Sequence, residues 1–315
     1  MTPNAPPETA IARFGADVLN CGVAIDTPIG ICVSGGADSL ALLLLARAAL
    51  PYFEAATVDH GLRAISADEA DFVADVCAKI GVVHRIIRLG PPEPGNRSDW
   101  ARRARYGALR DWAKLRGLSL LMTAHHSDDQ LETMLMRLNR GSGVAGLAGI
   151  RRRQADLCRP LLYWRKSELE TLVNAAGLHA VDDPTNHDDG YDRARLRKQL
   201  ASVDWLDPNA ATRSAAALAD ADASLDWAAR GLFDQYAKNE AAGVWLSLPA
   251  IPHELLRRVV RISLQAINSA AAPRGAALDA LLISLQSGER TTLCGVLCAG
   301  GTFWTFKPEP PRRTN

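Results

Sequence analysis

The sequence predicts an α/β protein in which a doubly wound, mostly parallel sheet is joined to a smaller, mainly helical C-terminal domain. Through the first two hundred residues, short apolar runs alternate with patterns of helical period. Such alternation is typical of a parallel sheet with helices on both faces. After residue 206, an alanine-rich stretch with acidic spacing, residues 210–229, predicts a long helix instead of another strand and helix pair. We therefore divide the chain into domains of residues 1–206 and 207–315.

The elements of the first domain follow in order along the chain. Apolar runs predict strands at residues 29–33, 55–58, 84–89 and 119–123. Amphipathic patterns predict helices that begin at Ser39 and that cover residues 66–80 and 98–115. In the second domain, apolar residues around a Gly-Gly pair predict a terminal hairpin over residues 291–306. Ligands of a parallel sheet bind at the carboxyl ends of its strands, so motifs that follow a strand are the first candidates for a site.

Composition limits the class of protein. The chain has 315 residues, of which 48% are hydrophobic and 23% are charged, as in ordinary globular proteins. It contains no run of ~18 apolar residues, and it begins with prolines and acids instead of a basic end and an apolar run. The six cysteines form no C-x-x-C pair. We therefore expect no membrane span, no secretory signal, and a reducing, cytoplasmic compartment.

The net charge of +1 does not indicate nucleic acid, but the basic residues are unevenly placed. Seven lysines and arginines fall within residues 97–116, and residues 151–153 are three arginines in a row. Arg102 and Arg105 precede Tyr106, and arginines beside an aromatic ring would suit an RNA backbone or a splayed base. Solvated helix faces and a structural role for the tyrosine are the alternatives.

The strongest motif, S-G-G-A-D-S at residues 34–39, lies directly after the first strand and before an apolar helix. Its glycines let the backbone approach a polyanion, and the Ser39 hydroxyl and the free amides of the helix start can donate to phosphate. No G-x-x-x-x-G-K-[ST] sequence is present, so the lysine of ordinary NTPases is missing. A tight turn that binds nothing is the alternative. Asp38 argues against it, because a carboxylate beside a phosphate is sensible only with a Mg²⁺ ion between them.

Two further motifs also follow strands. V-D-H-G-L-R at residues 58–63 follows the second strand, and taken alone it could be a polar turn. T-A-H-H-S-D-D-Q-L-E-T at residues 123–133 follows the fourth strand. At about 100° per residue, His125, Asp129 and Glu132 lie within about 60° of one another, opposite an arc of leucines. An amphipathic helix would then turn these three side chains outward together.

The carboxylate pair on that helix, Asp129 and Glu132, has three possible uses: metal binding, general acid–base catalysis, or recognition of an ammonium group. Surface acids that complement the helix dipole are the structural alternative. Further along, D-P-T-N at residues 183–186 precedes Arg193 and Arg197, which are four residues apart and share one helix face. Together these arginines could clamp a carboxylate or a phosphate.

These motifs resemble a known superfamily. S-G-G-x-D-S is the signature of the PP-loop ATP pyrophosphatases, which cleave ATP between its α and β phosphates to adenylate a substrate. Residues 123–147, together with V-D-H-G-L-R and the D-P-[ST]-N and arginine elements, are similar to the tRNA(Ile)-lysidine synthetase family within it. The resemblance covers about residues 31–200 and is loose beyond them. Ala194 departs from the asparagine that is usual between the two arginines.

The resemblance implies a carbon–nitrogen ligase that works in two steps on a PP-loop, adenine nucleotide α-hydrolase-like fold. ATP adenylates the C2 oxygen of the wobble cytidine in an isoleucine tRNA with a CAU anticodon, which releases pyrophosphate. The side-chain amine of free lysine then attacks C2 and expels AMP, leaving lysidine. Residues 1–206 would form the catalytic domain, and residues 207–315 would contact tRNA.

The same resemblance assigns roles to individual residues. ATP and its Mg²⁺ would be bound by Ser34, Gly35, Gly36, Ala37, Asp38 and Ser39, with Asp38 as the metal ligand. The catalytic set would be Asp38, His125, Asp129 and Glu132, with the histidine stabilising charge at the reacting centre. Lysine would be held by Asp129, Glu132, Arg193 and Arg197. The clusters of basic residues, rather than the resemblance, predict that Arg102, Arg105, Arg151 and Arg152 bind tRNA. Which arginine binds the lysine carboxylate is left open, and no motif predicts the oligomeric state.

Two other functions are compatible with the PP-loop. A tRNA thiolase also adenylates its substrate, and such enzymes commonly use paired cysteines, whereas Cys294 and Cys298 lie in the terminal hairpin, far in sequence from the loop. A non-catalytic tRNA- or nucleotide-binding protein with a decayed loop is the second alternative. The intact Asp38 and the intact run of residues 125–132 argue against decay.

Overall fold

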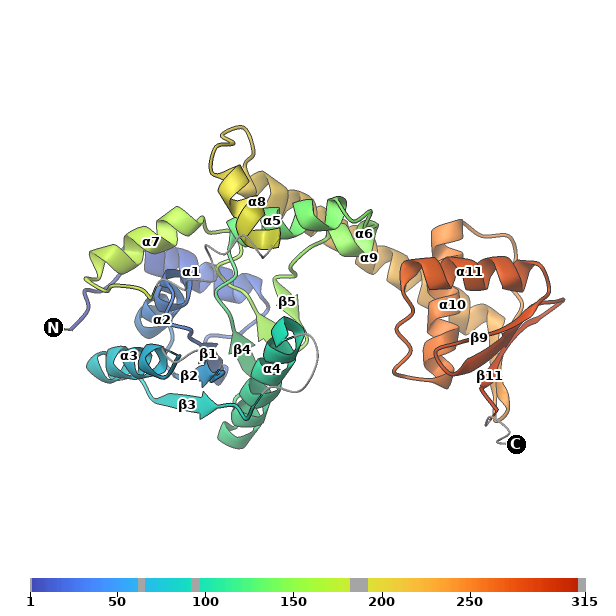
Figure 1. Ribbon diagram of the computed structural model, residues 1–315, viewed down its shortest axis with the longest axis horizontal. Coiled ribbons are helices and arrows are strands. Elements are labelled where there is room, and N and C mark those ends of the chain that lie inside the picture. Colours follow the sequence, from blue (N-terminus) through green and yellow to red (C-terminus); the bar gives the residue numbers. More distant parts are fainter. Residues whose placement is uncertain (1, 62–65, 92–96, 182–191, 311–315) are drawn as a thin grey trace. The chain divides into compact units, whose positions relative to one another are not determined.

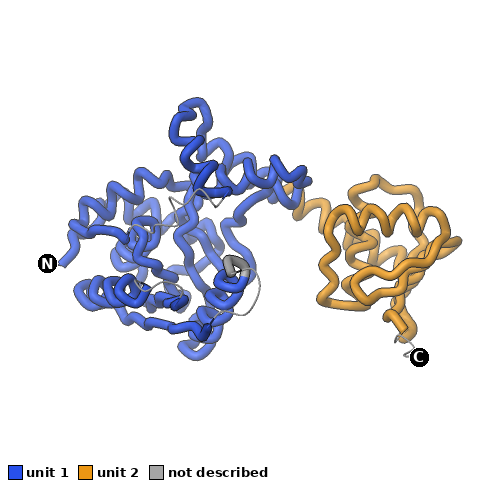
Figure 2. Tube along the Cα trace, viewed as in Figure 1, with its two compact units in different colours: residues 1–219 blue, residues 220–315 orange. Residues whose placement is uncertain are grey.

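The computed structural model describes residues 2–61, 66–91, 97–181 and 192–310. The chain divides into two compact units, residues 1–219 and residues 220–315 (Figure 2). The division lies inside the long helix α9 (Pro208–Tyr236), whereas the change in composition sets it just before that helix, after residue 206. Within the described residues, no helix combines the length and the apolar character that crossing a membrane requires.

A six-stranded sheet forms the centre of the first unit, with strand order β3-β2-β1-β4-β6-β5 (Figure 1). Five of these strands run parallel and β5 is antiparallel. The prediction of a mostly parallel sheet is confirmed, and each of the four predicted strands is present. The strands are β1 (Ile29–Cys32), β2 (Phe53–Asp59), β3 (His84–Arg88), β4 (Leu120–Met122), β5 (Arg153–Gln154) and β6 (Leu157–Cys158).

Helices cover both faces of this sheet. One face packs against α4 (Arg97–Arg116). In the strand order, β2 and β3 lie on one side of β1, and β4 lies on its other side. The crossover direction therefore changes between β1 and β4, and the crevice at such a switch point is where ligands bind. The opposite face of the sheet packs against four helices: α1 (Glu8–Asn20), α2 (Ala37–Ala49), α3 (Ser66–Lys79) and α7 (Lys166–Ala175).

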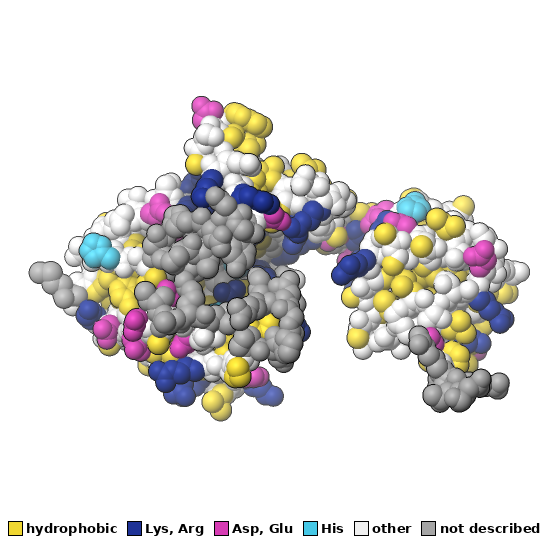
Figure 3. Space-filling model, in the orientation of Figure 1, with side chains coloured by type: hydrophobic (Ala, Val, Ile, Leu, Met, Phe, Trp, Pro, Cys, Tyr) yellow, Lys and Arg dark blue, Asp and Glu magenta, His cyan; other side chains and the backbone are white. Residues whose placement is uncertain are grey.

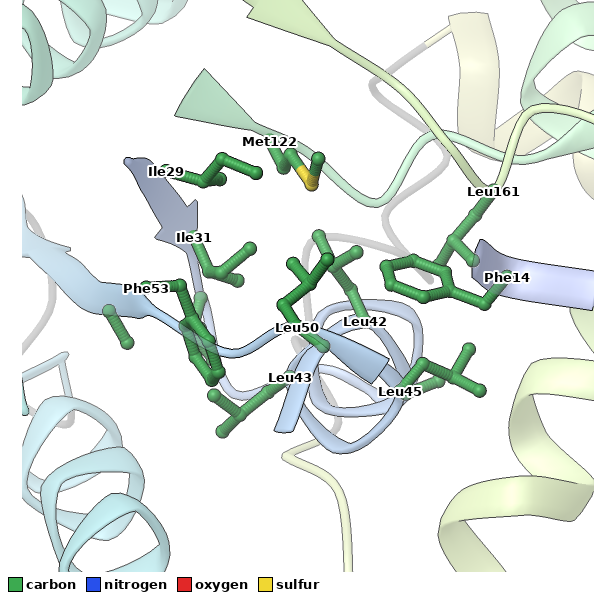
Figure 4. Close-up of a cluster of buried hydrophobic side chains, with 14 of the residues drawn as sticks. Phe14, Ile29, Ile31, Leu42, Leu43, Leu45, Leu50, Phe53, Met122 and Leu161 are labelled. Atoms are coloured by element: carbon green, nitrogen blue, oxygen red, sulfur yellow. The ribbon is translucent and has the colours of Figure 1, made fainter. Parts of the chain in front are cut away.

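The apolar helix α2 packs on strand β1 in the core shown in Figure 4. Leu42, Leu43 and Leu45 are fully buried in this core, as are Ile29 and Ile31 of the strand. A helix that is apolar on several sides needs cover on several sides, which the sheet and the neighbouring helices supply. The S-G-G-A-D-S loop that joins β1 to α2 is therefore held between two buried elements.

The opposite face of β1 carries Gly30. A Cβ atom built at Gly30 would lie 2.7 Å from the Trp112 ring of α4 and 2.8 Å from the Leu121 side chain. Real Cβ atoms do not approach neighbouring atoms that closely, so glycine is the residue that lets α4 pack directly on the central strand.

The second unit combines helices with a sheet of its own. Helices α10 (His253–Ile267) and α11 (Gly275–Gln286) pack on a five-stranded antiparallel sheet of order β7-β8-β11-β10-β9. The predicted alanine-rich helix is confirmed in α9, and the predicted terminal hairpin in β10 and β11, whereas the other three strands had not been expected. These strands are β7 (Ala237–Glu240), β8 (Gly243–Leu246), β9 (Arg290–Leu293), β10 (Val296–Ala299) and β11 (Trp304–Pro308).

We expect Gly30→Ala to lower the free energy of unfolding by about 1–3 kcal/mol, because the added methyl group overpacks the contact between β1 and α4. Gly107→Ala is the matched control: this glycine is exposed within α4 and nothing lies within 4 Å of a Cβ built there. Alanine at that helical position should raise the stability by about 0.5–1 kcal/mol. Urea unfolding of both variants measures the difference, and equal effects would contradict the packing assigned to Gly30.

Candidate active site

The PP-loop lies at the carboxyl end of the central strand β1. Gly36 caps α2 from an extended conformation and, among the described residues, no side chain bonds to the first amides of the helix. The Ser39 hydroxyl donates to the Gly36 carbonyl at 2.9 Å and accepts from the Ser34 amide at 3.1 Å. Gly35 has a φ of +88°, which favours glycine. The start of α2 therefore offers open donors and a positive dipole end, as anion binding requires.

Asp38 supplies a carboxylate in the first turn of α2. Its Oδ2 atom lies 3.5 Å from His126 Nε2, whereas its buried Oδ1 atom has no hydrogen-bond partner in the part of the chain that is described. A buried oxygen without a partner is costly, and a hard cation is a partner that suits it. No group of three acidic, histidine or cysteine side chains in the described residues could hold a metal ion. The unpartnered oxygen of Asp38 is thus chemically suited to be one ligand of a hard cation such as Mg²⁺.

His126 is the imidazole that meets this carboxylate. It is the N-cap of α5 (Ser127–Leu138), and its side chain is 2% exposed. Its Nδ1 atom lies 3.6 Å from Asp128, and its Nε2 atom lies 3.5 Å from Asp38 and from Asp129. Burial lowers the pKa of His126, but the three carboxylates outweigh burial and raise the pKa to about 10. A buried histidine that faces carboxylates on both helices therefore links the first turn of α2 to the first turn of α5.

His125, the histidine of the predicted catalytic set, lies before the helix. Because α5 begins only at Ser127, the helical period that grouped His125 with Asp129 does not extend to it, and that placement was wrong. Its Nδ1 atom lies 2.9 Å from Thr123 Oγ1, and burial lowers the pKa of His125 to about 4 despite the charge of Asp129. His125 is therefore mainly neutral at neutral pH, and in this form it can hydrogen-bond without carrying charge. The sequence signal for His126 was its position directly before the S-D-D helix start, where an N-cap stands.

Asp129 and Glu132 face helix α8 (Asp192–Leu200) instead of solvent. Arg197 donates from Nε and Nη2 to the two carboxylate oxygens of Glu132, at 2.7 and 3.0 Å. The same Nη2 atom lies 3.7 Å from Asp129 Oδ1, and Arg193 Nε lies 3.5 Å from Glu132 Oε2. The Glu132 side chain is only 4% exposed. The expected outward direction of Glu132 was therefore wrong, because α8 covers that face of α5.

The two arginines of α8 share one face, as their spacing predicts. Arg193 donates to Thr133 Oγ1 at 2.8 Å, and Arg197 forms the bidentate pair with Glu132. The carboxylate that Arg197 grips in this structure thus belongs to the protein. Arg193 is the more open of the two side chains, 46% exposed against 31% for Arg197.

Arg102 and Arg105 lie on α4, each with its guanidinium carbon 5.3 Å from the centre of the Tyr106 ring. The tyrosine itself is buried, which agrees with the structural alternative for that residue. Figure 3 shows Lys and Arg side chains on the visible face over α5, α6 (Val144–Leu147) and α8.

The three consecutive arginines do not form a solvated loop. Arg151 and Arg152 are half-buried, and Arg152 lies 3.6 Å from Asp17 and over the Tyr163 ring at 4.6 Å. Arg153 donates to the carbonyl of Gly22 at 2.7 Å. Much of this basic run is therefore used to attach residues 151–153 to the rest of the unit.

The second motif forms a turn. The Asp59 carboxylate accepts from the Gly61 amide at 2.9 Å and from the Ser66 hydroxyl at 2.7 Å, which agrees with a polar turn before α3. Residues 62 and 63 of that motif and D-P-T-N at residues 183–186 lie outside the described residues.

The parallel sheet, its switch point and the open start of α2 define a PP-loop protein, and a family model for the PP-loop domain matches residues 9–203. The fold is similar to that of U34-tRNA thiolase NcsA from Methanococcus maripaludis with its 4Fe–4S cluster. That structure has a TM-score of 0.55 and 18% identity, over 67% of this chain and 80% of the other.

Curated relatives match nearly the whole chain. The tRNA(Ile)-lysidine synthase of Novosphingobium aromaticivorans is 42% identical, over 97% of this chain and 96% of its own length. That of Zymomonas mobilis is 38% identical, over 90% of this chain and 89% of its own length. The chain therefore belongs to the tRNA(Ile)-lysidine synthase family.

We expect Glu132→Gln to lower the free energy of unfolding by about 1–3 kcal/mol, because it removes the charge from a buried, bidentate pair with Arg197. Glu170→Gln is the matched control, since its ion pair with Lys166 at 3.6 Å is exposed and should contribute less than about 1 kcal/mol. Denaturant titration of both variants compares the two pairs. A Glu132 effect no larger than that of the control would contradict its burial by α8.

Proposed function

We propose that this chain joins the side chain of lysine to C2 of the wobble cytidine in an isoleucine tRNA with a CAU anticodon, using ATP and Mg²⁺ in the cytoplasm. The observation that carries this proposal is the position of Asp38 and Asp129, each 3.5 Å from the same buried nitrogen of His126. One carboxylate belongs to the PP-loop helix and the other to α5. Such proximity supports a reaction that passes from a nucleotide site to an adjoining ammonium site.

In the first step, the triphosphate of ATP binds at the start of α2, where open amides and the Ser34 and Ser39 hydroxyls can donate to it. Mg²⁺ held by Asp38 would neutralise charge on the leaving pyrophosphate. The C2 oxygen of cytidine attacks the α-phosphorus, and the bond between the α-phosphorus and the bridging oxygen to the β-phosphate breaks. His125, with Nδ1 held near Thr123, can present Nε2 as a hydrogen-bond partner to the base.

In the second step, the lysine amine attacks C2 and the C2–oxygen bond to AMP breaks. Asp129 is our candidate for holding the ammonium before it loses its proton. Glu132 is already bound by Arg197, so we assign it a positioning role within the same lysine site, beside Asp129. Arg193 is the more exposed arginine, and we assign the lysine carboxylate to it.

We further propose that residues 207–315 form a tRNA-contacting domain. The second unit has its own buried core, built from α9, α10, α11 and the antiparallel sheet. The PP-loop unit therefore does not need it to complete its sheet, which leaves it available for recognising RNA outside the anticodon.

The function is tested by incubating the full chain with a CAU-anticodon isoleucine tRNA, ATP, Mg²⁺ and labelled lysine, followed by mass analysis of the nucleosides. Label in the wobble nucleoside, with one AMP and one pyrophosphate released per lysine, is the expected result. Pyrophosphate release with sulfur transfer from an added donor would indicate a thiolase. Binding of tRNA without pyrophosphate release would indicate a non-catalytic protein.

We expect Asp38→Asn to reduce tRNA-dependent pyrophosphate release by at least about a hundredfold, because loss of a metal ligand at the leaving group is worth several kcal/mol. The variant should remain folded with a lowered unfolding midpoint, because it loses the charged Oδ2 contact with His126 while Asp128 and Asp129 still face that ring. Asp26→Asn, at an exposed position before β1, is the control that should leave the rate unchanged. A wild-type rate with ordinary Mg²⁺ dependence in Asp38→Asn would show that Asp38 does not hold the ion.

Asp129→Asn should raise the lysine concentration needed for half-maximal ligation by about ten- to a hundredfold, the value of one charge-assisted hydrogen bond. Pyrophosphate release at saturating tRNA and ATP should survive at least in part, because the adenylation step uses the α2 side of the site. Steady-state assays of both half-reactions separate these effects. Normal lysine dependence together with collapsed ATP turnover would assign Asp129 to the metal or the nucleotide.

A further inference from the structure

Arg159 is a buried cation that the two steps above leave unused. It follows β6 directly, at the same edge of the sheet as the PP-loop, and it is 3% exposed. Its Nη1 atom donates to the Arg151 carbonyl at 2.7 Å, while its buried Nε atom has no partner among the described residues. No carboxylate in that part of the chain forms an ion pair with it. A buried guanidinium without an anion is costly, so a missing anion is the simplest account of it.

The backbone holds Arg159 beside the strand that carries His125. Strands β6 and β4 are parallel neighbours, and the Thr123 amide donates to the Cys158 carbonyl at 3.0 Å. Thr123 in turn contacts His125 through its hydroxyl, at 2.9 Å. Arg159 is therefore fixed next to the connection where the reacting base is expected, and its strand is separated from β1 by β4.

Arg102 of α4 brings a second guanidinium to the same place. Burial lowers the pKa of Arg159, and the nearby charge of Arg102 lowers it further, as it also does for His125 and Arg137. Arg102 itself is exposed and lies against the Tyr106 ring. The Tyr106 ring belongs to the same buried cluster as Leu157 of β6, two residues before Arg159. The two guanidinium groups thus lie on neighbouring elements, and they repel each other unless an anion binds.

We propose that Arg159 and Arg102 form a binding site for one phosphate group of the substrates. Phosphate oxygens accept in bidentate fashion from planar guanidinium groups, and two positive charges match the anion. The inference rests on the proposed function, because tRNA and ATP are the phosphate-bearing substrates of that reaction. Two features of its position favour a phosphate of the RNA backbone. The site lies beside His125, and β4 separates it from β1, the strand that leads to the triphosphate site at α2.

The test measures binding of each substrate alone to the full chain, with Arg159→Gln, Arg102→Gln and the control Arg85→Gln, an exposed residue of β3. The first two variants should weaken tRNA binding in the absence of ATP by about ten- to a hundredfold. Their salt dependence, log Kd against log salt, should become shallower by about 0.7–0.9, because one RNA phosphate is no longer neutralised by the protein. ATP affinity without tRNA should not change, and Arg85→Gln should alter neither.

Each outcome bears on the proposal. Weaker ATP binding in place of weaker tRNA binding would support the phosphate site and assign it to the nucleotide. Unchanged affinities for both substrates would overturn it and leave Arg159 as an anchor for the Arg151 carbonyl. The unfolding midpoint shows whether Arg159→Gln folds. If it does not fold, tRNA binding by Arg102→Gln tests the proposal, because Arg102 is exposed. Because the readout is binding, failure of the unaltered protein to form lysidine would refute the proposed function and leave the phosphate site standing.

Discussion

Burial of β1 on both of its faces is the constraint on which the site depends. Leucines of α2 cover one face, and Trp112 of α4 covers Gly30 on the other. A strand covered on both sides cannot slip by one residue, because its whole set of side chains would exchange faces. The register of β1 against β4 is therefore fixed, and with it the separation between the PP-loop and the connection that follows β4. Asp38 and His126 meet because these two strands are neighbours.

Charge compensation at that meeting point sets the state of the carboxylates. Three acids in so small a volume would repel one another, and burial by itself would raise the pKa values of Asp128 and Asp129. Hydrogen bonds that Asp128 accepts from His126 and from the Lys166 amide nevertheless hold its pKa below the usual range, and the charge of His126 does the same for the pKa of Asp129. Both helices also direct their positive dipole ends at these acids. Asp128 and Asp129 are thus ionised at neutral pH.

Local signals in the sequence were sufficient for much of this arrangement, and contacts between distant segments decided the rest. Each predicted strand and the loop after β1 follow from local patterns, as does the shared face of the α8 arginines.

The direction of Glu132 was predicted wrongly because its partner Arg197 lies 65 positions away and no local pattern indicates that helix. His126 received no role because the helical period was extended back to His125, whereas α5 begins at Ser127 and makes His126 its N-cap. Arg159 carries no motif, since only the fold shows that it is buried without an anion. Strands β7, β8 and β9 of the second unit were missed because strands of four residues leave little periodicity.

The net charge of the chain is close to zero although its charged residues are unevenly paired, and for this reason composition does not indicate RNA binding. Many acidic residues away from the site form ion pairs within the protein; examples are Arg116–Glu54, Arg110–Asp156 and Arg258–Asp222. Arg137 and Arg159 bond instead to backbone carbonyls, which leaves their charge uncompensated. Binding to nucleic acid depends on the cations that replace counterions at individual phosphates, not on the sum over the chain. A chain of net charge +1 can therefore carry a local, salt-sensitive RNA surface, because many of its charges are paired within the protein and a few arginines bond to carbonyls instead.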